Sequence, residues 1–132
     1  MGKYTKQITR NAEIINALHA RIHETVKERD INGLKNKEWK TACEAFHKQY
    51  DTLAFPGGFE GAYKRIENGD EQAMEAAICF LECRPYFFRS GYMFKDILRK
   101  SKNAPLNKDQ QARLQKIIEA YNEYKQSKKH NK

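Results

Sequence analysis

The sequence predicts an all-α protein, a single-domain bundle of five to six helices. Apolar residues recur at helical spacing along most of the chain, and no segment alternates polar and apolar residues with the β-branched enrichment of a strand. The length of 132 residues is typical of one domain with one hydrophobic core. Successive helical hairpins with HEAT-like packing are compatible with this pattern.

Two apolar stripes predict the first two helices. The first stripe runs from Ile8 to Val26, and its helix should end before Gly33. The second helix should begin near Asn36, a residue type that caps helices, and its stripe extends to Leu53. The sequence Phe55-Pro56-Gly57-Gly58 then predicts the main internal loop, because proline and glycine disfavour a continuing helix.

Two further helices are predicted in the middle of the chain. A short helix over residues 59–67 should stop at Asn68-Gly69, which is a typical helix exit. Asp70 should cap the next helix, over residues 71–83. This helix is apolar nearly all round, so we expect it to be the most buried helix of the bundle.

The remaining third of the chain predicts a kinked pair of helices and a long last helix. Pro85 suits a first helical position, and Ser90-Gly91 can interrupt the chain and cap a second segment. Asn103-Ala104-Pro105 should end that segment. Asn107, with Gln110 three residues later, resembles a capping box ahead of the last helix.

The predicted domain covers residues 1–125. Residues 126–132 contain no apolar side chain and three lysines, which predicts a basic, flexible tail.

Charge is distributed unevenly along the chain. Six basic residues and one acidic residue give residues 84–102 a local charge of +5, whereas the five acids of residues 67–83, with no base, give −5. The whole chain carries +8. Because tyrosine and phenylalanine alternate with the bases, we predict a basic, aromatic binding surface. Its predicted partner-binding residues are Arg84, Tyr86, Arg89, Tyr92, Lys95, Arg99 and Lys102.

Possible metal ligands are present but weakly patterned. His19 and His23 stand one helical turn apart, and Cys43/His47 together with Cys79/Cys83 provide the ligand types of a zinc site. Surface histidines and buried thiols are the favoured explanation of both patterns, because the cysteines fall among apolar residues, as small buried hydrophobic side chains do. Gly57-Gly58 lacks the ending of a phosphate-binding loop. We therefore predict no metal, no cofactor and no enzymatic activity.

The compartment is predicted from what the chain lacks. Three cysteines without CxxC spacing are typical of a reducing compartment. No apolar run reaches the roughly 20 residues that span a bilayer, and residues 1–10 lack the apolar core of a secretory signal. We expect a cytoplasmic protein with no membrane partner.

The segment Pro85-Tyr86-Phe87-Phe88-Arg89-Ser90-Gly91-Tyr92, followed by Leu98-Arg99, Ala104-Pro105-Leu106 and Arg113-Leu114, resembles small, poorly characterised bacterial helical proteins. The resemblance covers about residues 78–118. It implies an all-α fold with a turn at residues 89–92.

Two functions follow as hypotheses. The first is a non-enzymatic protein-binding module, in the manner of a bacterial immunity protein that covers a toxin's active site, with an acidic protein partner. The alternative is a nucleic-acid-binding protein that uses residues 84–102 and the C-terminal tail, as the pI of about 9.4 suggests. The acids of residues 67–83 would repel phosphate if they shared that surface.

Overall fold

The structure is a computed structural model that describes residues 2–130. In this part of the chain all regular structure is helical, which confirms the predicted all-α bundle and its helix number. The helices are α1 (Thr5–Val26), α2 (Gly33–Ala54), α3 (Ala62–Glu67), α4 (Glu71–Cys83), α5 (Ser90–Lys102) and α6 (Lys108–His130).

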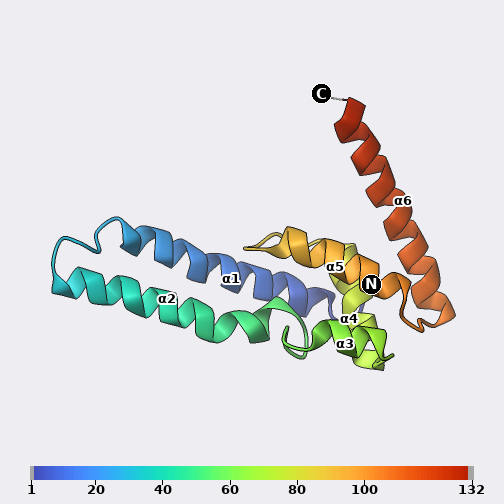
Figure 1. Cartoon of the computed structure of the whole chain (residues 1–132), viewed down its shortest axis with the longest axis horizontal. Helices are drawn as coiled ribbons and strands as arrows, with labels where there is room; N and C mark the ends of the chain where they lie inside the picture. The colour runs from blue at the N-terminus through green and yellow to red at the C-terminus, as the bar shows by residue number, and fades with distance from the viewer. Residues whose placement is uncertain (1, 131–132) are drawn as a thin grey trace.

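The α1 and α2 helices lie side by side as a long antiparallel hairpin, whose turn extends beyond the other helices (Figure 1). The cap of α2 is Asn32, whose side-chain oxygen accepts a hydrogen bond from the Lys35 amide at 2.9 Å. The predicted start near Asn36 was therefore too late, because an earlier residue of the same type caps the helix.

The α4 helix forms the centre of the bundle and contacts α1, α3, α5 and α6. Its residues Ile78, Cys79 and Phe80 are completely buried. The Asp70 carboxylate accepts a hydrogen bond from the Ala73 amide at 2.8 Å. The predicted bounds, cap and central position of this helix are confirmed.

Two predicted helix starts were wrong for the same reason, a backbone that turns left-handed. Gly61 has a φ of 75°, so α3 begins at Ala62 and not at Phe59. Arg84 has a φ of 46°, which ends α4; no helix is present over residues 85–89, and α5 begins only after Arg89, whose φ is 69°. The expected kinked pair is instead a non-helical segment followed by α5.

The capping box ahead of α6 is confirmed. The Asn107 side chain accepts from the Gln110 amide at 2.8 Å, and the Gln110 side chain accepts from the Asn107 amide at 3.1 Å. The helix continues to His130 and projects away from the other helices (Figure 1). Residues 126–130 of the predicted tail are therefore helical, and residues 131–132 of it lie outside the described residues.

Candidate functional site

Residues 85–88 connect α4 to α5, and we call this segment the bridge. Burial of one side chain and three hydrogen bonds hold its backbone in place. The Phe87 side chain is buried in the core. Three hydrogen bonds hold the backbone: Asn16 Nδ2 donates to the Tyr86 carbonyl at 2.9 Å, Tyr50 Oη donates to the Phe88 carbonyl at 2.8 Å, and the Phe87 amide donates to Ser90 Oγ at 3.0 Å. Tyr86 projects into solvent, whereas the half-exposed Phe88 ring stacks on His19 at 5.2 Å between centroids and contacts the Phe46 ring at 5.9 Å.

This bridge borders an open groove of about 1040 Å³, which is also lined by α1, α5 and α6. We call it the basic groove. Four of its aromatic side chains are exposed: Tyr86 by 89%, Tyr92 by 73%, Tyr124 by 45% and Phe88 by 43%. Its cations are Arg84, Arg89, Lys95, Lys125 and Lys128, and no Asp or Glu lines it.

Four of the five cations of the basic groove, Arg84, Arg89, Lys125 and Lys128, lie against aromatic rings and not against carboxylates. Arg84 lies 4.9 Å from the Phe94 ring centre and 4.5 Å from that of Tyr124. Arg89 lies 5.3 Å from the Phe88 ring centre. None of the five groove cations forms an ion pair with a carboxylate of residues 2–130. Their charges therefore remain available to an anionic ligand.

The two arginines of the basic groove occupy strained backbone positions. Arg84 and Arg89 are the non-glycine residues with positive φ in the described chain, at 46° and 69°. A left-handed backbone costs a side-chain-bearing residue about 1 kcal/mol, which glycine avoids. Strain of this kind is concentrated at functional sites in proteins. Arg84 and Arg89, at the two ends of the bridge, are therefore candidate functional residues.

The groove brings together five of the seven predicted partner-binding residues, Arg84, Tyr86, Arg89, Tyr92 and Lys95. It does not include Arg99, which pairs with Asp96 at 3.2 Å, or Lys102. Both lie on the same face of α5 as Lys95 but about 6 and 10 Å farther along the helix, beyond the end of the groove.

Sequence reasoning missed the contribution of α6 to the groove. Tyr121, Tyr124, Lys125 and Lys128 all line it. Their spacing of three and four residues places them on one helical face, which was the available signal. Only Lys128 falls in the segment that was predicted as a flexible tail, whereas Tyr121, Tyr124 and Lys125 lie within the predicted helical domain.

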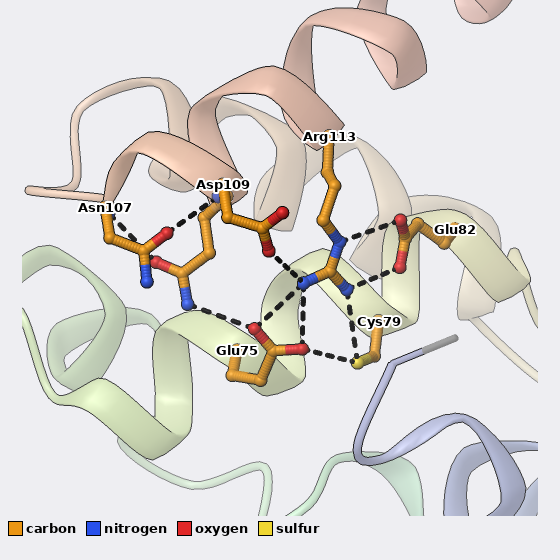
Figure 2. A network of polar contacts seen from close by, with 7 residues as sticks. Glu75, Cys79, Glu82, Asn107, Asp109 and Arg113 are labelled. Atoms are coloured by element: carbon orange, nitrogen blue, oxygen red, sulfur yellow. Dashed lines mark hydrogen bonds and ion pairs between the residues drawn. The ribbon is translucent and has the colours of Figure 1, made fainter.

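The α6 helix is held on α4 by Arg113, whose contacts are drawn in Figure 2. The Arg113 guanidinium donates to both Glu82 oxygens, from Nε at 3.0 Å and Nη2 at 2.6 Å. Its Nη1 donates to both Glu75 oxygens at 3.0 Å. Asp109 Oδ2 also lies 3.4 Å from Nη1. This network fixes the base of α6, from which the helix extends along the groove.

The same network sets the ionisation of Glu75. Burial raises the pKa of this carboxyl, but hydrogen bonds from Gln110, Cys79 and Arg113 oppose burial and leave the pKa below its ordinary value. The pKa of Arg113 is raised, chiefly because it donates hydrogen bonds to Glu82. Both groups therefore stay charged at neutral pH.

The possible metal ligands do not come together. The rings of His19 and His23 are neighbours, with centroids 4.7 Å apart. Within residues 2–130, however, no three histidine, cysteine or acidic residues are placed to hold one ion. Cys79 is buried, which raises the pKa of its thiol, whereas Cys43 and Cys83 are half-buried.

The chain matches no model of a known protein family, no characterised protein and no solved structure. The resemblance to small bacterial helical proteins and the HEAT-like relation therefore stay predictions. Across the described residues, each helix is too short or too polar to span a bilayer.

Proposed function

We propose that the protein is a non-enzymatic binding module whose basic groove binds an acidic segment of a partner protein. The observation that carries the proposal is a groove lined by five cations and no acid, with none of the cations neutralised within residues 2–130. An acidic partner gains Coulomb attraction from every one of them.

The exposed rings supply the rest of the binding energy. Tyr86 and Tyr92 border the groove with most of their surface in water. Tyrosine and arginine are enriched among the residues that dominate binding at protein interfaces. The hydrogen bond to the Tyr86 carbonyl fixes the backbone that carries this ring before the partner arrives, which lowers the entropic cost of binding.

Toxin neutralisation in the manner of a bacterial immunity protein is the specific role we propose for such a module. It requires a partner with an acidic face, since the chain itself carries +8. A cytoplasmic location belongs to the same proposal and is supported by three cysteines that are free thiols.

The test is affinity capture from lysate, with and without nuclease treatment. The double variant Arg89→Gly/Tyr92→Ala removes one cation and one exposed ring from the groove. A matched control, Leu34→Ala/Lys37→Ala, removes an apolar side chain and a cation from the exposed start of α2. A defined protein that survives nuclease, binds the control and is lost with the groove variant supports the proposal.

A second candidate is single-stranded nucleic acid. Cations beside exposed aromatic rings are also the features of strand-binding grooves, where bases stack on the rings. Nuclease treatment distinguishes the candidates, because it removes a bound nucleic acid and leaves a partner protein. Salt weakens both kinds of binding, since both use the groove cations, and it weakens binding of a strand with many phosphates more steeply.

A further inference from the structure

A second hollow adjoins the basic groove between α4, α5 and α6. It has a volume of about 420 Å³. Its lining combines apolar and aromatic residues with four charged ones: Leu81, Phe94, Ile117, Ala120 and Tyr121, and Glu82, Arg84, Arg113 and Lys116. We call it the α6 pocket. This volume lies within the range of sites that take a small molecule or one large side chain.

The α6 pocket and the basic groove share a wall. Arg84, Phe94 and Tyr121 line both of them. The Phe94 and Tyr121 rings contact each other, with centroids 5.4 Å apart, and the Arg84 guanidinium lies beside both, 4.9 Å from the Phe94 centre and 5.8 Å from the Tyr121 centre. A chain that lies in the groove and passes this arginine therefore reaches the pocket without leaving the protein surface.

The two cavities differ in their charge. At the rim of the α6 pocket, Arg113 is neutralised by Glu75 and Glu82, with contacts of 3.0 and 2.6 Å (Figure 2). The basic groove has no such compensation. An acidic group therefore gains most in the groove, whereas an apolar group gains most in the pocket.

From this arrangement we propose that the partner segment is acidic and carries one large apolar side chain, which inserts into the α6 pocket while the acidic residues lie in the groove. This inference rests on the proposed function and specifies the recognised sequence. The proposal also explains why residue 84 is an arginine. The Arg84 guanidinium lines both cavities, contacts aromatic rings and carries a positive charge for the acidic residues of the partner.

The experiment uses labelled peptides and fluorescence anisotropy. One peptide alternates aspartate and glycine and ends in tryptophan, and a second has serine in place of the tryptophan. Ala120→Phe fills the α6 pocket from α6 without a charge change. Ala112→Phe makes the same change at an exposed position of α6 outside the pocket. Circular dichroism confirms that both variants remain folded.

We expect the tryptophan peptide to bind the wild-type protein about tenfold more tightly than the serine peptide, as burial of one large side chain provides. Ala120→Phe should abolish that difference, and Ala112→Phe should preserve it. A tenfold difference that survives Ala120→Phe would place the tryptophan elsewhere and overturn the inference.

The failures of the two proposals are distinguishable. If both acidic peptides bind with equal affinity and lose binding with Arg89→Gly, the anchor in the pocket is wrong and the groove proposal stands. If neither peptide binds, or if oligothymidylate binds far more tightly with a steep salt dependence, the proposed function fails and the inference fails with it.

Discussion

The substitution Arg89→Gly should stabilise the protein while it weakens partner binding. Arg89 has a φ of 69°, which costs a residue with a side chain about 1 kcal/mol and glycine almost nothing. The side chain lies in solvent, where its contact with the Phe88 ring contributes about 0.5 kcal/mol. The free energy of unfolding should therefore rise by about 0.5 kcal/mol, a shift in Tm of about 2 °C for a chain of this size.

Two control variants make the sign of this effect testable. Arg89→Ala keeps the strained backbone but loses the ring contact, so it should lower the free energy of unfolding by about 0.5 kcal/mol. Lys95→Gly removes another groove cation from within α5, where glycine costs about 1 kcal/mol. Thermal and urea denaturation measure all three variants, and anisotropy with the acidic peptide measures their binding.

A lower stability for Arg89→Gly than for Arg89→Ala would refute the argument from backbone strain. Unchanged peptide affinity in Arg89→Gly and Lys95→Gly would refute the role of the groove cations. If the argument holds, the glycine variant is more stable and binds less well, which means that the arginine is kept for binding at a cost in stability.

Three further predictions concern the supports of the site. Tyr50→Phe removes the hydrogen bond to the Phe88 carbonyl and should cost about 1 kcal/mol in urea denaturation. Burial raises the pKa of the Tyr50 hydroxyl more than nearby Arg89 lowers it. The stabilisation by the protonated hydroxyl is therefore complete below about pH 10 and is lost as the pH rises through the folded-state pKa. Tyr50→Phe should not show this loss of stability at alkaline pH. Glu75 has a lowered pKa, so its stabilisation is present above about pH 4.5 and is lost at lower pH; Glu75→Gln should flatten the acid side of the stability profile. Ser101→Ala removes a fully buried hydroxyl without a hydrogen-bond partner within residues 2–130 and should raise the free energy of unfolding by about 1 kcal/mol.

Helix bounds could be predicted from the sequence where they depend on residues that are close together in the chain. The bounds of α4 follow from the Asp70 cap and a continuous apolar stretch, and the start of α6 follows from the Asn107 and Gln110 pair. Each of these features operates within about one helical turn, which is the range that sequence patterns describe.

The bridge at residues 85–88 could not be predicted in this way. Its conformation depends on Asn16 and Tyr50, which lie 70 and 38 residues away from the carbonyls to which they donate. Pro85 and the aromatic residues after it suit a helix locally, but tertiary hydrogen bonds and burial of Phe87 determine the outcome. The groove residues of the bridge and of α5 were therefore predictable, whereas the α6 residues of the groove and the orientation of each side chain were not.

Most acidic residues of segment 67–83, which precedes the basic segment 84–102, form contacts within the protein. Glu75 and Glu82 pair with Arg113, and Glu67 pairs with Lys100. Asp70 caps α4. These acids stabilise the protein and do not line the basic groove, so they do not oppose an anionic ligand there. The sequence contrast of −5 followed by +5 thus separates two tasks. The acids join α3 to α5 and α4 to α6, whereas the cations at the two ends of the bridge and at the start of α5 form no ion pair within residues 2–130.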